Sequence, residues 1–424
     1  MTQLDVPALT RSAEAGSPAA ALALARHWLQ ADDNAAALEW YQRSAESGLV
    51  AAQSEFGRLL IFGVAEHIDV AAGVAWLRRA EGAGDATAPY VLAMLALGEP
   101  QPDPGTIGRR LLASARLGHP PALRSLALHL GRYGTATDAA RATALLESAA
   151  AAGDRTSSAL YAHRLAAGIG QAPDRVRAQA IVRQLAAGGL QVTLPEPSDT
   201  EPVAFAGDPV PWSIDLAPAL KLADAPRTLH EAPLVRVAEN VLGDEECRFL
   251  RHYGAPLVRP SLAVDPVSGQ SVRLDYRNSR DIAIDPLFDD VTLRLLQHRM
   301  AALAGLPLAN AEPMVLLNYR PGEEYRPHAD YLPAGRFTAV ADGGTGQRCA
   351  TVIVYAGAVE AGGATRFLEL DLEVEPAPGR AVHFQNLKPD GSPEPRSRHA
   401  GLPVVRGEKW IASLWFREGR HRAV

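Results

Sequence analysis

A glycine recurs at nearly constant intervals through the first 190 residues, and this period restricts the fold more than any other feature of the chain. The glycine closes short alanine-rich segments such as "SAEAGS" and "SAESGL", and it stands at positions 16, 48, 84, 118, 153 and 188. The intervals of 32, 36, 34, 35 and 35 residues are typical of stacked helix pairs. Because glycine readily takes the left-handed conformation that ends a helix, we expect one helix of each repeat to end there.

The rest of each repeat agrees with paired helices. Small alanine side chains let two helices approach closely, and Trp40 and Trp76 each stand eight residues before a repeat glycine. We expect these tryptophans to be core anchors where two repeats meet. Residues 5–190 resemble the Sel-one-like branch of the tetratricopeptide-type repeats. This resemblance implies a superhelical scaffold that binds other proteins, and a purely supporting role for the second half is the alternative.

The composition changes after the repeats, which span residues 1–190. Residues 191–232 are rich in proline and acidic residues, which predicts a linker that packs on one neighbour through Trp212. In residues 233–424, two amphipathic segments, "GDEECRFLRHYG" and "PLFDDVTLRLLQHRMAALAG", predict helices. Short β-branched runs predict strands: "PLVRVAENVL", "EPMVLLNYR", "RCATVIVYAG", "ATRFLEL", "RAVHFQN" and "KWIASLWFRE". The chain is therefore expected to be a multidomain α + β protein, a helical solenoid followed by a jelly roll (double-stranded β-helix) with flanking helices.

Bulk composition excludes several classes of protein. A formal net charge of −6 argues against a dedicated nucleic-acid surface. The two cysteines, Cys247 and Cys349, predict no disulfide framework and favour a reducing compartment. The opening "MTQLDVPALTRSAEAG" lacks the pattern of a signal peptide, and no uncharged apolar run is long enough to span a membrane. We expect a cytoplasmic protein with neither nucleic-acid nor membrane partners.

Three side chains form a candidate metal site. His328 and Asp330 stand two residues apart in "NYRPGEEYRPHADYLPAG", a spacing that places both on one face of a strand. His399 precedes the final predicted strand and supplies a third ligand. Two histidines and one carboxylate on one face of an ion leave coordination positions open, as in non-haem Fe(II) oxygenases.

The final predicted strand offers a place for a co-substrate. Lys409 lies ten residues after His399, and strand alternation puts Lys409 on the same face as Ile411, Ser413 and Trp415. If this face points inward, the ammonium of Lys409 meets the far carboxylate of 2-oxoglutarate in the same hollow as the metal. A solvated lysine at a strand end is the alternative.

Residues 233–418 resemble the catalytic domain of the prolyl 4-hydroxylase family of Fe(II)/2-oxoglutarate dioxygenases. The motifs that carry the resemblance occur in order: "NYRPGEEYRPHADY", "GQRCATVIVYAG", "EAGGATRF", "GRAVHFQNLKPDGSPEPRSRHAGLPV" and "GEKWIASLWF". The resemblance implies hydroxylation of a prolyl residue in a protein or peptide, with release of succinate and CO₂. It also implies Fe(II), 2-oxoglutarate and O₂, with ascorbate as the reductant.

The resemblance assigns a role to each matching position. His328, Asp330 and His399 match the iron ligands, and Lys409 matches the residue that pairs with the distal carboxylate of 2-oxoglutarate. The remaining matches are Tyr319 for a hydrogen bond to the co-substrate, Thr351 and Trp415 for the pocket lining, and Tyr325 and Arg348 for positions near the substrate. Two departures are Arg398, where the family usually has an apolar residue, and Arg417, where some relatives have histidine. Both bear on the substrate.

Other interpretations stay open. The same chemistry could act on a free amino acid or small metabolite, or the repeats could form an adaptor with an inactive oxygenase half. His383 in "RAVHFQN" could be mistaken for the third ligand, but we expect it to be a core or sheet-face histidine. The segment "PAGRFTAVADGGTGQ" reads as a lid over the site, since it lacks the lysine of a phosphate loop.

Overall fold

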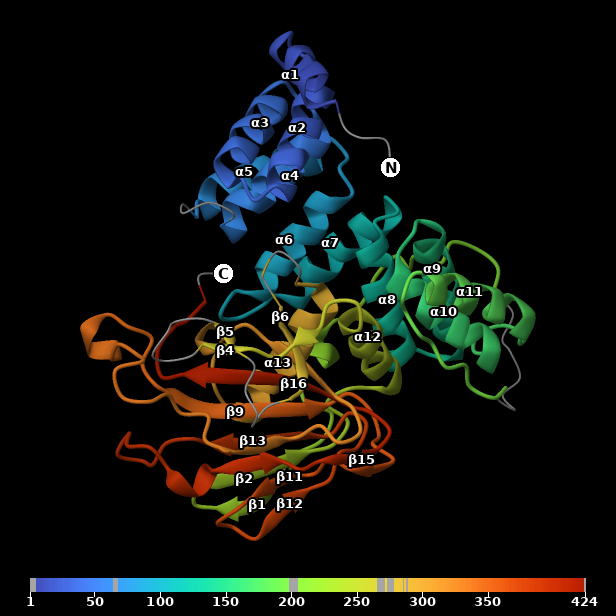
Figure 1. The fold of residues 1–424 in the computed structure, drawn as a ribbon. Coiled ribbons are helices and arrows are strands. Elements are labelled where there is room, and N and C mark those ends of the chain that lie inside the picture. Colours follow the sequence, from blue (N-terminus) through green and yellow to red (C-terminus); the bar gives the residue numbers. More distant parts are fainter. Residues whose placement is uncertain are drawn as a thin grey trace.

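The repeats form a row of helices in which each helix packs against the next along the chain (Figure 1). The computed structural model describes residues 5–63, 68–197, 205–264, 271–272, 278–284, 286 and 289–422. The repeat helices are α1 (Val6–Glu14), α2 (Pro18–Gln30), α3 (Asn34–Glu46), α4 (Val50–Phe62), α5 (Val70–Gly82), α6 (Thr87–Leu97), α7 (Pro104–Arg116), α8 (Pro120–Tyr133), α9 (Ala136–Ala151), α10 (Arg155–Ala167) and α11 (Arg175–Ala187). The predicted solenoid is confirmed.

The repeat glycines act as predicted, with one correction. Helices α1, α3, α5, α7 and α9 each end two residues before such a glycine. The φ angles are +92° at Gly16, +89° at Gly48, +83° at Gly84, +79° at Gly118 and +91° at Gly153. In the last repeat the left-handed residue is Gly189, with φ +84°, whereas Gly188 has φ −88°. Either glycine of the pair fits the sequence pattern, so the spacing did not distinguish them.

The tryptophans lie at repeat contacts but are only half buried. Trp40 and Trp76 pack against the same hydrophobic cluster, which contains residues of α2, α3 and α4. The ring of Trp76 meets Phe56 edge-on at 5.8 Å. An arginine from the next turn covers each indole, because Arg43 and Arg79 lie 4.8 and 5.2 Å from the ring centroids of Trp40 and Trp76. These anchors therefore seal the edge of the repeat core.

The described residues of the C-terminal half form two α-helices and two main sheets (Figure 1). The helices are α12 (Asp244–Gly254) and α13 (Val291–Ala304), the second starting later than its amphipathic segment because Asp290 caps it. The strands are β1 (Arg227–Glu231), β2 (Leu234–Ala238), β3 (Arg259–Pro260), β4 (Ala263–Val264), β5 (Ser271–Val272), β6 (Arg280–Ala283), β7 (Val315–Tyr319), β8 (Tyr325–His328), β9 (Arg348–Tyr355), β10 (Ala361–Gly362), β11 (Thr365–Phe367), β12 (Leu372–Val374), β13 (Ala381–Gln385), β14 (His399–Gly401), β15 (Val404–Arg406) and β16 (Lys409–Arg417). Short 3₁₀ turns occur at Ala217–Leu220, Leu308–Asn310, Val340–Asp342 and Pro395–Ser397.

The strands form a sandwich, as the jelly-roll prediction requires. The large sheet has the order β1-β2-β13-β9-β16-β7-β6-β3, and the small one has the order β12-β11-β14-β8. The recorded pairings within both sheets are antiparallel. Apolar side chains of both sheets, such as Phe367 of β11 and Phe384 of β13, form one cluster between them. The opposite face of the large sheet contacts α13 and joins a second, larger core.

That larger core is shared with the repeats. It extends from Tyr90 in α6 to Phe416 in β16 without a boundary between the two halves. Polar contacts cross the same junction: Arg124 of α8 donates to Asp290 at 2.7 Å, and the Tyr90 hydroxyl donates to the same carboxylate oxygen at 2.9 Å. The two halves therefore have a fixed arrangement, which the sequence did not predict.

The segment between the halves takes part in this junction. Val210 and Leu216 are buried in the shared core. The prediction that Trp212 packs on a neighbour is wrong, because its side chain is 92% exposed. The guanidinium of Arg116 lies 5.3 Å from its ring centroid. The last repeat helix ends at Ala187, and strand β1 begins inside the predicted linker. The domain limits at residues 190 and 233 stay a prediction. In the described part of the chain, no helix has both the length and the apolar character that a membrane crossing requires.

Candidate active site

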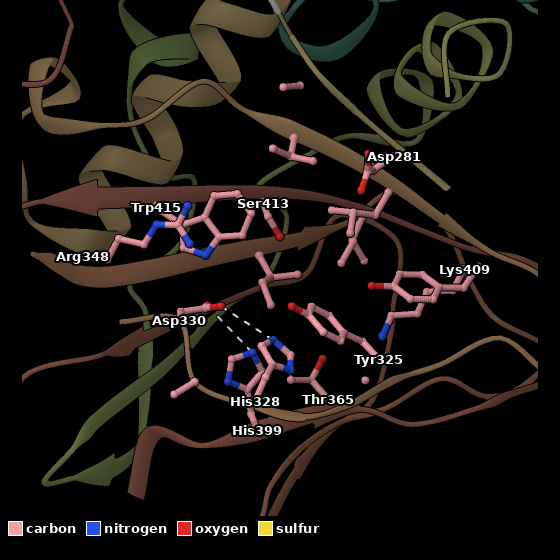
Figure 2. A pocket seen from close by; sticks show the side chains of 18 residues that line it. Asp281, Tyr325, His328, Asp330, Arg348, Thr365, His399, Lys409, Ser413 and Trp415 are labelled. Atoms are coloured by element: carbon pink, nitrogen blue, oxygen red, sulfur yellow. Dashed lines mark ion pairs between the residues drawn. The ribbon is translucent and has the colours of Figure 1, made fainter. Parts of the chain in front are cut away.

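Strands β8 and β14 bring the three predicted metal ligands together. His328 is the last residue of β8, His399 is the first of β14, and the two stand opposite each other in the antiparallel pairing. Asp330 lies in the bend just after β8, so the predicted same-face spacing along a strand does not hold, although the carboxylate still turns toward both imidazoles. Its oxygens lie 3.7 Å from His328 Nε2 and 3.9 Å from His399 Nε2, as the dashed lines in Figure 2 mark. One ligand atom from each residue lies within 4.8 Å of the others.

Hydrogen bonds to the backbone determine which ring nitrogen of each histidine can bind a metal. The Nδ1 of His328 lies 2.9 Å from the carbonyl oxygen of Arg326, and the Nδ1 of His399 lies 3.0 Å from that of Ser397. A carbonyl oxygen can only accept, so Nδ1 carries the proton and Nε2 offers its lone pair to the centre of the cluster. Two imidazole nitrogens and one carboxylate, each fixed by an outer hydrogen bond, fit a divalent transition metal such as Fe(II).

Asp330 is held in its ionised form. Burial alone pushes the pKa of this carboxyl upward, but the adjacent His399 and His328 and a hydrogen bond outweigh that effect and hold the pKa below its ordinary value. The hydrogen bond comes from the hydroxyl of Thr351, 2.7 Å from Oδ2. The amide of Asn386 donates to the Thr351 oxygen at 2.9 Å, which fixes the direction of the hydroxyl. Thr351 was expected to line the pocket; it instead supports the carboxylate from behind.

A cavity of about 310 Å³ opens from the three ligands into the sandwich (Figure 2). Lys409 and Tyr319 line its wall away from the ligand cluster, next to each other because the two residues pair between β16 and β7. The Lys409 ammonium is buried, 5.4 Å from the ring of Tyr319 and 5.7 Å from that of Tyr355. Burial lowers the pKa of Lys409 to about 7, and only Glu375 opposes that shift. Such a cation favours an anionic guest.

The predicted alternation of the last strand is confirmed. Four residues of β16 line the cavity: Lys409, Ile411, Ser413 and Trp415. The intervening ones belong to the core shared with the repeats: Trp410, Ala412, Leu414 and Phe416. One strand therefore builds the pocket with one face and anchors it to the helices with the other.

Comparisons with known proteins agree with this geometry. The 2OG-Fe(II) oxygenase superfamily model matches residues 314–417. The mouse prolyl 4-hydroxylase subunit alpha-1 is 32% identical over 188 residues, which cover 44% of this chain and 35% of that protein. Prolyl 4-hydroxylase 1 of Arabidopsis thaliana is 30% identical over 207 residues, which cover 46% of this chain and 72% of that protein. The chain belongs to the prolyl 4-hydroxylase family. It spans about a third of the length of the mouse relative.

Two solved structures also resemble parts of this prolyl 4-hydroxylase-family chain. The viral collagen prolyl hydroxylase of Paramecium bursaria Chlorella virus-1 is 26% identical, with a TM-score of 0.35, over 43% of this chain and 95% of that one. A Sel1 repeat protein from Oxalobacter formigenes is 22% identical, with a TM-score of 0.35, over 44% of this chain and 85% of that one.

Two residues that were predicted to lie near the substrate, Tyr325 and Arg348, line the same cavity as the three candidate metal ligands. The ring of Tyr325 stacks on His328 with a centroid separation of 3.5 Å. Arg348 lines the cavity and donates from Nε and Nη2 to Glu312, both at 2.7 Å. Its guanidinium also covers the ring of Trp415 at 4.3 Å. The arginine is therefore fixed at the edge of the pocket rather than mobile.

The two departures from the family pattern have different surroundings. Arg398 is exposed and does not line the cavity. Arg417 donates to the carbonyl oxygen of Gly346 at 2.7 Å and shares Glu312 with Arg348, its Nε lying 2.7 Å from the carboxylate. Glu312 thus joins the two arginines, and no motif in the sequence marked it.

The prolyl 4-hydroxylase-family sheet also buries His383, as expected for a core histidine. It stands in β13 outside the ligand cluster, and neither ring nitrogen has a hydrogen-bond partner among the described residues. Burial lowers its pKa to about 4, so the ring is neutral.

Sequence reasoning missed Asn386, although it belongs to the same "HFQN" run, and Asp281, which lines the cavity from β6. The role of residues 333–347 as a lid stays a prediction.

Proposed function

We propose that this chain is an Fe(II)- and 2-oxoglutarate-dependent dioxygenase that hydroxylates a prolyl residue of a protein or peptide. One observation carries the proposal: the ligand atoms of His328, Asp330 and His399 converge within 4.8 Å at a cavity whose wall also holds the buried Lys409. A metal centre and an anion-binding cation in one enclosed space are the two elements that this co-substrate needs. The named prolyl 4-hydroxylases among the relatives support the choice of substrate.

The three ligands would hold Fe(II) through two Nε2 atoms and one carboxylate oxygen. When bound, Fe(II) supplies the oxidation in which 2-oxoglutarate and O₂ yield succinate, CO₂ and a hydroxyl group on the substrate carbon. The protein contributes fixed ligands: backbone carbonyls orient both imidazoles, and Thr351 holds the carboxylate. These outer contacts keep the ligand set ready before the metal arrives.

Lys409 and Tyr319 would bind the far end of 2-oxoglutarate. The Lys409 ammonium has no carboxylate within ion-pair distance among the described residues, so the distal carboxylate of the co-substrate completes its pairing. Apolar neighbours such as Ile411 exclude water, which strengthens this interaction. The phenol of Tyr319 lies beside the same ammonium and can donate to the carboxylate.

Arg348 and Tyr325 would position the peptide next to the metal. Glu312 occupies Nε and Nη2 of Arg348 and holds the guanidinium plane over Trp415. The third nitrogen, Nη1, is then available to a substrate carbonyl. The repeats would recruit the protein that carries the proline, which raises its effective concentration at the pocket.

Turnover assays test this function. We expect the chain with Fe(II), ascorbate and 2-oxoglutarate to release succinate in a peptide-dependent manner, and the peptide to gain one oxygen atom by mass spectrometry. His328→Ala should abolish both signals, while Lys388→Ala, on an exposed residue outside the cavity, should retain them. Hydroxylation of free proline but of no prolyl peptide would favour the small-molecule alternative. Full turnover by His328→Ala would refute the assigned centre.

A further inference from the structure

A second cavity, here called the junction cavity, lies where the repeats meet the oxygenase half. It has a volume of about 530 Å³ and is bounded by α10, the chain after α11, α12 and the adjoining ends of β7 and β16. Figure 1 shows α12 between the last repeats and the sheet. Asn318 and Trp410 pair between these strands and line the junction cavity, whereas the next pair, Tyr319 and Lys409, lines the co-substrate pocket. The two cavities therefore lie on opposite faces of the same two strands.

Arginines dominate the wall of the junction cavity. Arg248 and Arg251 are three residues apart on α12, which puts them on one face of the helix, and Arg320 follows β7. The only carboxylate in the described lining is Glu408, which accepts hydrogen bonds from Asn318 at 3.3 Å and from the Trp410 indole at 3.2 Å. Positive charge thus exceeds negative charge on this wall.

The two helix arginines lack partners. Among the described residues, neither Arg248 nor Arg251 has a carboxylate within ion-pair distance, and the buried Nε of Arg251 has no hydrogen-bond partner. Burial, followed by the charge of Arg248 among the lowering effects, lowers the pKa of Arg251. Arg164 and Arg299, which are fully buried at the junction, differ, because each meets a glutamate through two nitrogens. Arg251 is therefore a partly buried cation that forms no direct ion pair with any described residue.

Two histidines complete the wall as neutral groups. Burial and the charges of Arg248 and Arg251 lower the pKa values of His163 and His252 to about 4. Each imidazole is neutral at pH 7 and offers one N–H, and the buried Nδ1 of His163 has no hydrogen-bond partner in the described chain. The junction cavity, which is partly open to solvent, therefore combines guanidinium groups with neutral hydrogen-bond donors, which is the chemistry that binds oxyanions.

We propose that the junction cavity binds a small multivalent anion, carrying phosphate or carboxylate groups, between Arg248 and Arg251 of α12. The volume lies in the range of about 300 to 1,000 Å³ that is usual for small-molecule sites. Such an anion offsets the unpaired charge and bridges the last repeat to the back of the oxygenase sheet. This site goes beyond the proposed oxygenase function, because it is separate from the metal and co-substrate pocket and needs neither.

Calorimetric titration of the full-length, iron-free chain tests the site. Inorganic pyrophosphate and citrate serve as separate probes at low ionic strength, the first for a phosphate ligand and the second for a carboxylate ligand. We expect one saturable site for at least one probe, and the tighter probe identifies the class of ligand. The double variant Arg248→Gln/Arg251→Gln should weaken that binding at least about tenfold, the loss of a charge-assisted contact.

Arg183→Gln is the control, since it removes one positive charge from an exposed position on α11 outside the cavity. It should leave the dissociation constant within about twofold, because exposed charges are screened. The absence of saturable binding of both probes, or equal weakening by Arg183→Gln, overturns the proposal.

Thermal unfolding separates a binding role for Arg251 from a packing role. Without a probe, Arg251→Gln should melt at the same temperature as the wild type or higher, because it removes a partly buried charge that has no ion-pair partner among the described residues. Saturating pyrophosphate or citrate, whichever binds, should raise the Tm of the wild type and leave that of the variant unchanged. A Tm that the substitution lowers equally with and without the probe makes Arg251 a packing residue and overturns its assignment.

Discussion

Buried cations at the junction between the halves and in the co-substrate pocket have opposite surroundings. At the junction, Arg299 of α13 is fully buried and donates to Glu246 of α12 at 2.7 and 3.1 Å. Glu246 also accepts from Arg132 of α8 and so ties the repeats to the oxygenase half. In the pocket, Lys409 is also buried, but it lies beside the rings of Tyr319 and Tyr355 and has no ion-pair partner among the described residues. Loss of its partner makes a paired buried cation strongly destabilising, whereas a buried cation without a partner offers a site to an anionic ligand.

The largest expected effect is a loss of stability when the buried ion pairs at the junction are broken. Glu246→Gln leaves Arg299 and Arg132 without their shared carboxylate, so we expect the free energy of unfolding to fall by about 3 to 5 kcal/mol. Urea unfolding followed by circular dichroism measures the change. Glu39→Gln is the control, because Glu39 forms an exposed pair with Arg43 and should cost less than about 1 kcal/mol. If both substitutions lowered the free energy of unfolding by the same small amount, the buried ion pairs of Glu246 would matter no more to stability than an exposed pair.

Lys409→Met tests the buried cation of the co-substrate pocket and should increase the stability of the protein. The pKa of Lys409 falls from 10.5 to about 7 on folding, so removing the amine should raise stability at pH 7 by up to about 4 kcal/mol. The same variant loses the partner of 2-oxoglutarate, and its KM for the co-substrate should rise about ten- to a hundredfold. Urea unfolding and succinate release give the two values. If Lys409→Met were less stable than the wild type and had the same KM for 2-oxoglutarate, Lys409 would be a structural residue and not a ligand-binding one.

A smaller effect is expected behind the metal cluster. Thr351→Val removes the hydroxyl that donates to Asp330 while it keeps the shape of the side chain. We expect the Fe(II) concentration for half-maximal turnover to rise about tenfold or more, since outer contacts of metal ligands have effects of this size. Thr143→Val, which changes a buried threonine in α9, is the control. A metal requirement that shifts equally in both variants would reflect general destabilisation.

The sequence predicted the repeats well because their information is local. A glycine at fixed spacing ends a helix wherever it stands, and φ near +90° at Gly16 and Gly48 follows from that local rule. The metal ligands were found for a different reason, since ordered motifs around His328 and His399 resemble a known family. Strand alternation alone would have placed Asp330 on a strand, where the structure has a bend.

Contacts between distant segments could not be read from the sequence. Glu312 reaches Arg348 across 36 positions, and Tyr90 reaches Asp290 across 200. No local pattern marks such pairs, because burial and partner choice arise only when the two halves pack. The same limit explains Trp212, which looked like a packing residue in a proline-rich linker but is 92% exposed. Large apolar side chains are usually buried, but this general tendency does not hold for Trp212.

The pH dependence of co-substrate binding gives the smallest and most specific test. Below about pH 7 the Lys409 ammonium is already charged, so the affinity for 2-oxoglutarate should be nearly constant there. Above this pKa the free site loses its proton, and binding the carboxylate must restore it. We therefore expect the dissociation constant to rise by up to about tenfold per pH unit between pH 7.5 and 8.5, with proton uptake visible in calorimetry. Lys409→Met should bind weakly with a flat profile, and a wild-type affinity that does not change over this range would remove the lysine from the site.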